Sequence, residues 1–222
     1  RLISVVGILI FHCTSSMYHP SIINEATYAT LKKVFEVDDV KKHFALAGGT
    51  SLALQLKHRH SIDLDIFSTV PFDTYVFERV LTNESGFIFE RVNSNKNMLF
   101  AYINSIKCDF IYEPSKLLQP FLVKDTISYF SIADITAMKM HTICGRRKKK
   151  DFFDVYVLLE NFGWEQMLQW FVNKYDKSQL YFLYRSIHYF EDANEDPDIT
   201  GIAPYTKNWD EIKEFLHISC KI

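Results

Sequence analysis

The sequence predicts an α/β (α+β) domain with a mixed or antiparallel sheet, followed by a C-terminal helical bundle. Segments with β-type and helical patterns alternate over the first half of the chain, and three β-rich runs follow one another up to Tyr112. From Ser131 almost to the end, the apolar spacing is helical. The 222 residues suffice for one domain plus a modest second one. We therefore expect a separate N-terminal segment 1–16, an α/β domain 17–125 and a helical domain 126–222.

The α/β half is predicted to begin with a helix and then a strand that ends in two glycines. Residues 24–37 carry apolar side chains at helical spacing, and Asn24 is a typical N-cap residue. The apolar run 44–47 ends at Gly48-Gly49, and a segment rich in helix-forming residues follows. This pattern predicts a strand, a tight glycine turn and a helix. Another helix is expected over 72–81, where Pro71 suits the first turn.

The remaining strands and helices follow from the same periodicities. Residues 62–67 alternate apolar with acidic residues, which predicts a strand with Asp63 and Asp65 on one face. Short polar turns join three β-rich runs that we expect to form an antiparallel meander, over 87–92, 98–103 and 106–112. Five helices are expected after them, over 131–144, 148–162, 164–175, 180–190 and 209–218. The stretch 191–204 is predicted to be the one long loop of this half.

The composition indicates a globular protein without a strong overall charge. Hydrophobic residues make up 48% of the chain and the formal net charge is −2, so a grip on nucleic acid would need a local basic patch. The four cysteines show no C-x-x-C spacing, which argues against a zinc site or a disulfide framework and favours a reducing cytoplasm. The apolar run 2–11 is too short to span a membrane. We interpret residues 1–16 as an appended segment, and expect a cytoplasmic protein that does not act at a membrane.

The residues with the clearest chemical meaning lie between 44 and 67. Glycines allow the backbone to approach a phosphate, and the N-terminus of the following helix presents free N–H groups to it. Two aspartates on one strand face, Asp63 and Asp65, are suitable ligands for Mg²⁺ or Mn²⁺, because these ions bridge carboxylates and substrate phosphates. In the strand 106–112, alternation places Asp109 and Lys107 opposite the apolar side chains. If this strand lies beside the first, Asp109 becomes a third metal ligand.

Two stretches of the chain resemble a known enzyme family. The run G-G-T-S-L-A-L-Q-L-K-H-R-H-S-I-D-L-D-I-F, from Gly48 to Phe67, resembles the first motif of the AbiEii-type nucleotidyltransferase toxins, which belong to the polymerase-β-like superfamily. Lys139 and the run R-R-K-K-K-D-F-F-D, from Arg146 to Asp154, resemble the later lysine and the K-D-F-x-D segment of that family. The resemblance covers the chain from about Met17 to its C-terminus.

The resemblance implies a metal-dependent transfer of a nucleotide from an NTP to a hydroxyl acceptor, with tRNA as the acceptor of related toxins and an antitoxin as the partner protein. By position, the triphosphate would be held by Gly48, Gly49, Thr50 and Ser51. The metals would be held by Asp63 and Asp65, with Asp109 added from strand alternation. Lys139 and Asp154 would complete the site. Arg59 and Ser61 are expected beside the nucleotide, where they would tune the metal-binding strand.

Several of these residues also have a purely structural interpretation. Lys139 lies on an apolar helix face, so its amine could instead extend to solvent. Asp151 is interpreted as half of a surface ion pair, and Lys150 with Asp154 has the i,i+4 spacing of such a pair. His58 and His60 lack the partners of a zinc site.

Two larger groups of side chains also leave alternatives open. The basic residues Arg146, Arg147, Lys148, Lys149 and Lys150 lie at a predicted helix N-terminus, where cations oppose the helix dipole. RNA or a triphosphate could supply the compensating anion, and so could Asp151 and Asp154. A group of aromatic residues in the last helices is interpreted as core, with a stacking platform for RNA bases as the alternative: Tyr181, Phe182, Tyr184, Tyr189 and Phe190.

Three functions therefore remain open from the sequence. The first is a toxin-like enzyme that nucleotidylates RNA, and the second is a binding module that keeps the nucleotide cleft without catalysis. The third is a transferase whose acceptor is a protein or a small molecule. The complete set of expected carboxylates favours an enzyme.

Overall fold

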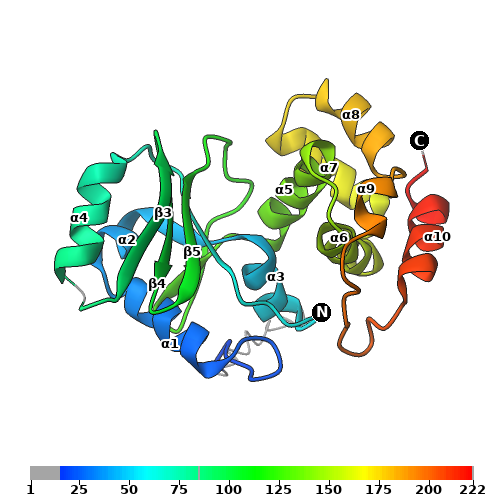
Figure 1. Ribbon diagram of the computed structural model, residues 1–222. Coiled ribbons are helices and arrows are strands. Elements are labelled where there is room, and N and C mark those ends of the chain that lie inside the picture. The colour runs from blue at the N-terminus through cyan, green and yellow to red at the C-terminus, as the bar shows by residue number, and fades with distance from the viewer. Residues whose placement is uncertain (1–15, 85, 222) are drawn as a thin grey trace, which may run out of the picture.

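The computed structural model describes residues 16–84 and 86–221, so almost all of the expected appended segment lies outside the described residues. Figure 1 shows a sheet with its helices beside a second, helical half, with α3 and α5 where the two meet. The elements of the first half before the sheet's meander are α1 (Glu25–Val34), α2 (Asp38–His43), β1 (Phe44–Leu46), α3 (Gly48–Leu56), β2 (Leu64–Ser68) and α4 (Thr74–Glu84). Asn24 caps α1 as predicted, because its side chain accepts a hydrogen bond from the Thr27 backbone N–H at 2.8 Å.

The sheet is mixed, as the sequence predicted. Its other strands are β3 (Phe89–Asn95), β4 (Met98–Ile103), β5 (Ile106–Tyr112), β6 (Leu122–Lys124) and β7 (Ile127–Tyr129). The strand order is β3-β4-β5-β2-β1-β7-β6. The pairs β3–β4 and β4–β5 form the predicted antiparallel meander, whereas β5 pairs with β2, and β7 with β1, in parallel. The parallel β2–β5 pair matters for function because it joins the two aspartate-bearing segments.

The second half is helical, and its elements begin close to the predicted residues. It contains α5 (Ile132–Gly145), α6 (Lys149–Phe162), α7 (Trp164–Lys174), α8 (Gln179–Ser186), α9 (Glu191–Asn194) and α10 (Trp209–Ser219). Two details of the prediction are wrong. The helix expected over 180–190 ends at Ser186, and the short helix α9 lies inside the segment expected to be a loop.

The junction of the halves lies later than residue 125 in the structure. Strand β7 belongs to the sheet, because the Phe130 N–H donates to the Leu46 carbonyl at 2.9 Å directly after it. Ser131 then caps α5 by accepting from the Asp134 N–H at 3.1 Å. The missed strands β6 and β7 are only three residues long, too short for a period-2 pattern to identify. The division into two domains, 17–125 and 126–222, stays a prediction.

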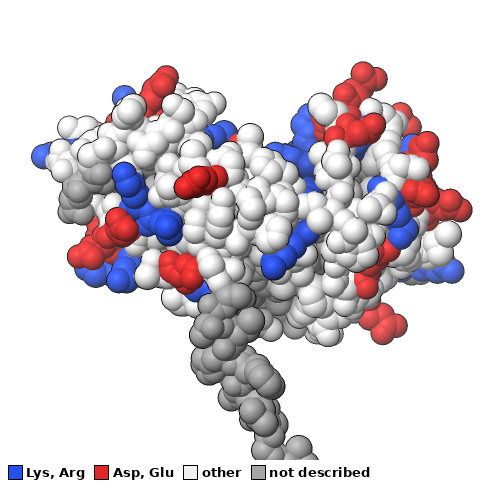
Figure 2. Space-filling view, turned by 90° about the horizontal axis from the view of Figure 1, so that it is seen from below, with Lys and Arg blue, Asp and Glu red and all other residues white. Residues whose placement is uncertain are grey.

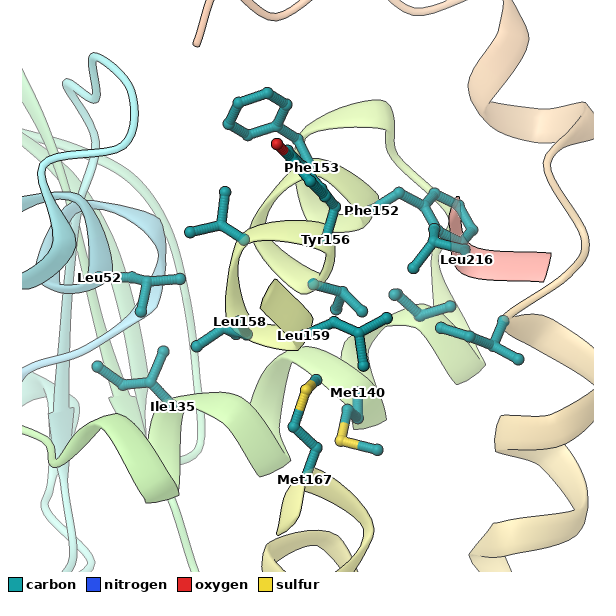
Figure 3. Packing of buried hydrophobic residues seen from close by; sticks show 14 of the residues in the cluster. Leu52, Ile135, Met140, Phe152, Phe153, Tyr156, Leu158, Leu159, Met167 and Leu216 are labelled. Atoms are coloured by element: carbon teal, nitrogen blue, oxygen red, sulfur yellow. The ribbon is translucent and has the colours of Figure 1, made fainter. Parts of the chain in front are cut away.

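Helix α6 forms the centre of the helical half. Its residues from Asp151 to Leu159 are all buried, so it has no solvent-facing stripe over that length. Figure 3 shows Leu52 of α3 and Ile135 of α5 directed toward α6 from one side, and Met140, Met167 and Leu216 packed around it. Full burial of each such side chain stabilises the fold by about 1.5–3 kcal/mol. Because Ala45, Ala47 and Leu52 belong to the same apolar cluster as α6, the two halves share a core.

The aromatic residues of the last helices do not all belong to this core, contrary to the first interpretation. Phe190 is buried, but Tyr181, Phe182 and Tyr189 are exposed. A periodic aromatic pattern does not distinguish a buried face from one that borders a cavity. Within the described residues, no helix is both long enough and apolar enough to cross a membrane.

Candidate active site

Asp65 and Asp109 lie side by side on the sheet. They are register partners in the parallel pair β2–β5, and both alternate with buried apolar residues on their strands. The condition under which Asp109 would lie beside Asp65, adjacent strands, is therefore met. Burial raises the pKa of Asp65, and the neighbouring Asp109 carboxylate raises it further, while Lys139 opposes this shift. Two carboxylates that disfavour each other's charge are typical of a site that receives a cation.

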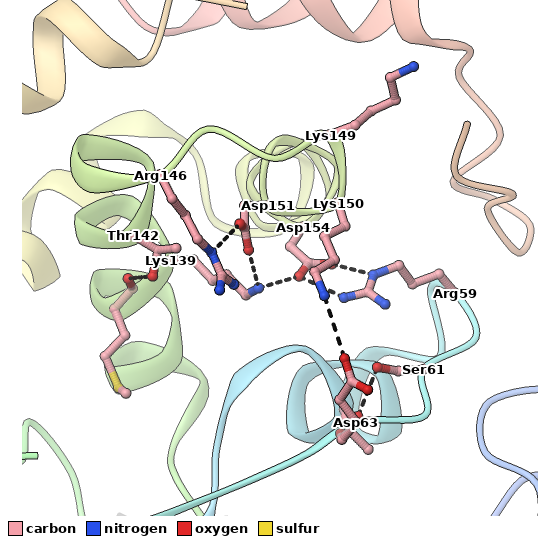
Figure 4. A network of polar contacts seen from close by, with 12 residues as sticks. Arg59, Ser61, Asp63, Lys139, Thr142, Arg146, Lys149, Lys150, Asp151 and Asp154 are labelled. Atoms are coloured by element: carbon pink, nitrogen blue, oxygen red, sulfur yellow. Dashed lines mark hydrogen bonds and ion pairs between the residues drawn. The ribbon is translucent and has the colours of Figure 1, made fainter. Parts of the chain in front are cut away.

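Asp63 lies directly before strand β2 rather than within it. Strand β2 begins at Leu64, and Ile62 is exposed, so the alternation predicted to start at Ile62 is wrong at its first two residues. The Asp63 carboxylate instead meets the Lys150 amine at 3.7 Å (Figure 4). Within residues 16–84 and 86–221, no group of three or more His, Cys, Asp or Glu side chains lies together in a metal-binding cluster. Besides burial and Asp109, the Asp63 carboxylate also raises the pKa of Asp65, so its role as a third metal ligand stays a prediction.

Gly48 lies directly against Asp65. Its φ is +62°, a left-handed conformation that favours glycine, and a Cβ at this position would lie 2.0 Å from the Asp65 Oδ2 atom. Gly48 is also the first residue of α3, and no side chain of the described residues caps this helix end. The first N–H groups of a helix have no intrahelical partner, so they remain available to an anion. The glycine therefore allows a carboxylate and a helix N-terminus to meet.

Thr50 and Ser51 are buried and use their hydroxyls inside the protein. Thr50 Oγ1 donates to the Asp63 backbone carbonyl and lies 2.8 Å from Ser61 Oγ. Ser51 Oγ accepts a hydrogen bond from the Gln55 amide at 3.1 Å. These contacts attach the 61–63 segment to α3, which positions the start of β2. A direct contact of the two hydroxyls with a triphosphate stays a prediction.

Asp154 of α6 is the centre of a buried network of charges (Figure 4). Its carboxylate accepts hydrogen bonds from Arg59 Nε at 2.7 Å and Arg59 Nη2 at 2.9 Å, and it lies 2.7 Å from Lys139 Nζ. His58 Nε2 lies 2.8 Å from the same carboxylate. Burial alone would raise the pKa of Asp154, but Arg59, Lys139 and His58 hold it well below its usual range. Asp154 thus positions the cations around it.

Lys139 and Arg146 meet at a second buried carboxylate, Asp151. Lys139 Nζ donates to Asp151 Oδ1 at 2.8 Å, and Arg146 Nε donates to Asp151 Oδ2 at 3.1 Å. Asp151 is fully buried, so the expectation of a surface ion pair is wrong. The Lys139 amine is buried too, and therefore does not extend to solvent. Burial would lower the pKa of Lys139, but Asp154 and Asp151 raise it, so the amine stays charged beside the cleft.

His58 is a site residue that the sequence interpretation missed. It is fully buried, and burial lowers its pKa although Asp154 opposes this shift. The H-x-H spacing raises the question of a zinc site. It does not predict that one of the two histidines lies beside a buried carboxylate and orients it. The sequence contains one clue to this role, because His58 directly precedes Arg59. In the structure Arg59 binds the same Asp154 carboxylate.

The five basic residues around the start of α6 each have a carboxylate partner in the described residues. The pairs are Arg146–Asp151, Arg147–Asp192, Lys148–Asp196, Lys149–Asp198 and Lys150–Asp63. The expected Lys150–Asp154 pair is replaced by the one with Asp63. Figure 2 displays the molecule from below. On this face, acidic and basic side chains are interspersed over the helical half, without a large area of one sign. The geometry favours internal compensation, and RNA binding by this run stays a prediction.

A cavity of about 700 Å³ joins these elements. Gly48 and the sheet residues Asp65, Phe67, Phe100, Asp109 and Ile111 line one side. The other side is formed by α5, including Lys139, by Arg146 directly after it, and by Gln179 and Phe182 of α8. A negatively charged pair, a free helix N-terminus and two cations therefore border one space. The charged groups can hold a cation and an anionic ligand together, and the aromatic residues that line the same cavity suit a ligand with a flat ring.

The donor set fits a divalent metal ion on one side. Asp109 Oδ1 is buried and has no hydrogen-bond partner among the described residues, while Asp109 Oδ2 accepts from Lys107 Nζ at 2.8 Å. A buried carboxylate oxygen without a donor is costly, and a cation would satisfy it. Asp65 would provide a second oxygen ligand, and oxygen ligands are those that Mg²⁺ and Mn²⁺ prefer.

Comparisons with known proteins show the family to which the chain belongs. The model of the AbiEii family, described as nucleotidyl transferase AbiEii toxin of the type IV toxin–antitoxin system, matches residues 30–217. An uncharacterized protein of Aquifex aeolicus (strain VF5) is 32% identical over 179 residues, which cover 78% of this chain and 84% of that protein.

The fold recurs in a solved structure that superposes over most of the chain. MenT4, a nucleotidyltransferase toxin from Mycobacterium tuberculosis, superposes with a TM-score of 0.60 at 13% identity, over 88% of this chain and 81% of its own. The Megavirus polyadenylate synthase gives a TM-score of 0.44 at 18% identity, and the match covers 61% of this chain and 32% of that one. The family match extends from α1 to α10 and includes every residue of the site described above, so this chain belongs to the AbiEii family of nucleotidyltransferase toxins.

Proposed function

We propose that this protein transfers a nucleoside monophosphate from an NTP to a hydroxyl of RNA, with tRNA as the acceptor, and that an antitoxin protein restrains it in the cytoplasm. The observation that carries the proposal is the Asp65–Asp109 pair beside Gly48 and the N-terminus of α3. Nucleotidyl transfer needs a place for a triphosphate next to carboxylates, and this arrangement supplies both.

Asp65 and Asp109 would hold Mg²⁺ or Mn²⁺, and Asp63 would join them after leaving Lys150. A bound divalent ion supplies charge neutralisation for the phosphates and orients the attacking oxygen. The Lys150–Asp63 pair is partly exposed and 3.7 Å long, so little energy opposes its separation.

The remaining work falls to the protein's own groups. The free N–H groups at the start of α3 would donate hydrogen bonds to the phosphates. Lys139 and Arg146 border the same cavity and would stabilise the negative charge that develops as pyrophosphate leaves. Asp154 and Asp151 keep Lys139 charged and in place, and Asp154 holds Arg59 behind Gly49, where a Cβ would lie 2.4 Å from Arg59 Nη2. These residues act by positioning and charge, which is the main protein contribution to phosphoryl-group chemistry.

An RNA acceptor is supported by exposed cations at the rim of the site. The side chains of Arg146, Lys148 and Lys150 are partly exposed and line a second cavity of about 450 Å³ with Asp196 and Ile199. Their ion pairs with carboxylates could exchange for pairs with RNA phosphates, because exposed pairs contribute little to stability.

The test is transfer of label from each of four α-³²P-labelled NTPs to total cellular RNA in the presence of Mg²⁺. Wild type should label RNA with one preferred NTP, and Asp65→Asn should label none. Asp198→Asn is the matched control, because Asp198 is 88% exposed and distant in sequence from the proposed ligands.

The rival functions give different results in the same experiment. If wild type binds NTP but releases no pyrophosphate with any acceptor, the protein is a binding module. Label that appears in protein or in small molecules, and not in RNA, would move the acceptor to those classes. An antitoxin partner is tested separately, by asking whether induction of wild type, but not of Asp65→Asn, stops cell growth.

A further inference from the structure

The cavity that holds Asp65 and Asp109 continues to helix α8. Gln179 and Phe182, both on α8, line it together with the two carboxylates. Helix α5 contacts both α3 and α8, and in Figure 1 α8 lies above α5 while α3 lies below it. The α8 residues therefore line the end of the cavity that is away from Gly48. Nothing in the proposed chemistry at the carboxylates uses this end.

Aromatic rings border the cavity from both halves of the protein. Phe100 of β4 is the register partner of Asp109, so it extends the carboxylate face of the sheet. Phe182 lines the helical side and is 51% exposed. Its ring centroid lies 5.6 Å from that of Tyr181 in a T-shaped arrangement, so the two rings do not stack face to face. An exposed aromatic ring beside a polar site is suited to stacking with a flat ligand group.

Gln179 adds a free polar group at the same end. Its backbone N–H donates to the Asp176 carbonyl at 2.9 Å, but its side-chain amide has no hydrogen-bond partner among the described residues. Thr142, which also lines the cavity, uses its hydroxyl to donate to the Met138 carbonyl at 2.8 Å. A glutamine amide offers both donors and an acceptor, which matches the edge of a nucleobase.

The two ends of the cavity differ in the way that the two ends of a nucleotide do. Charged groups and a helix N-terminus at one end match the phosphates, and aromatic and amide groups at the other end match the base. We propose that Phe182 and Gln179 of α8 bind the base of the incoming NTP, Phe182 by stacking and Gln179 by hydrogen bonds that select the base. This inference rests on the proposed function, because it assumes that the triphosphate lies beside Gly48. It assigns nucleotide selection to the helical half.

The test is calorimetric titration of the full chain with ATP, CTP, GTP and UTP in the presence of Mg²⁺, and with inorganic tripolyphosphate as a probe without a base. Phe182→Ala should bind the preferred NTP about tenfold more weakly, within the range for stacking of one base on one ring. Its affinity for tripolyphosphate should stay unchanged, and Phe182→Tyr should restore NTP binding. Gln179→Leu should reduce the preference among the four NTPs by about fivefold, as expected for one lost hydrogen bond.

The control is Tyr75→Ala, which also removes an exposed ring from a helix but lies on α4, outside the cavity. It should bind every probe as wild type does. Unchanged NTP binding by Phe182→Ala would overturn the inference, and so would an equal loss of NTP and tripolyphosphate binding. If wild type itself binds no NTP, the proposed function fails instead.

Discussion

At the scale of single residues, the site depends on buried charges that compensate one another. Asp154, Asp151 and Lys139 are all buried, and the Lys139 amine lies 2.8 Å from the Asp151 carboxylate and 2.7 Å from the Asp154 carboxylate. Such pairs add little stability compared with apolar packing, but removal of one member leaves an uncompensated charge. This explains why Asp154, which faces three partners, is more important for the arrangement than for direct contact with a substrate.

Substitution of Asp154 by Asn should therefore destabilise the protein strongly. Lys139 and Arg59 would remain buried without their shared carboxylate, so we expect a loss of about 3–5 kcal/mol in the free energy of unfolding. Urea denaturation monitored by circular dichroism measures it. The control Asp38→Asn breaks an exposed pair with Lys42 and should change stability by less than about 1 kcal/mol. Equal effects of the two substitutions would contradict the network's role.

The same network predicts a sensitivity to acid. Burial would raise the pKa values of Asp154 and Asp151, but Arg59, Lys139 and Arg146 lower them overall. A lowered pKa stabilises the fold above the unfolded value of about 3.9, and this contribution is lost as the pH falls through the folded-state pKa. The free energy of unfolding should therefore decrease below about pH 4, and less steeply in Asp154→Asn than in wild type. Parallel decreases, measured by denaturation at a series of pH values, would refute this assignment.

At the scale of elements, the decisive contact is between the start of α3 and strand β2. The strand–glycine–helix order and the helix cap at Asn24 could be predicted because glycine and capping residues act locally. The pairing of Asp65 with Asp109 could be predicted only under the condition that their strands are neighbours. Alternation along a strand shows which side chains share a face, but it does not show which strand lies beside it. The position of Asp63 before β2 and the partners of Asp154 depend on tertiary contacts, and no local pattern carries them.

Gly48→Ala should test this contact. The added methyl group would collide with the Asp65 carboxylate and also strain a left-handed backbone, so we expect transfer activity to fall at least about tenfold, a barrier increase of about 1.4 kcal/mol. The matched control is Gly86→Ala, because Gly86 has a similar φ of +57° and nothing lies within 4 Å of a Cβ there. Backbone strain alone would reduce the activity of both variants equally, and that result would remove Asp65 from the explanation.

At the scale of the whole molecule, the two halves are joined by a common core and by the charge network. Arg59 from the first half binds Asp154 from the second, and Leu52 belongs to the same apolar cluster as α6. The sequence indicated two regions, because periodicity changes near residue 130, but the shared core could not be seen from a change in periodicity. We place the proposed site between the halves because the first half supplies the aspartate pair and the second supplies Lys139, and both line the same cavity.

This joint core predicts a single unfolding transition. All three tryptophans, Trp164, Trp170 and Trp209, lie in the helical half, so their fluorescence reports on that half alone. Urea unfolding followed by tryptophan fluorescence should have the same midpoint as hydrogen exchange of the β4 and β5 amides. Separate midpoints would show two independently folding domains.

The most direct test of the central claim compares NTP labelled at the α-phosphate with NTP labelled at the γ-phosphate. The site described here predicts that label from the α-phosphate enters RNA and that one pyrophosphate leaves for each transfer. Both signals should be lost in Asp65→Asn and in Asp109→Asn. Transfer of label from the γ-phosphate, or undiminished transfer by either variant, would contradict a nucleotidyltransferase built on this pair of aspartates.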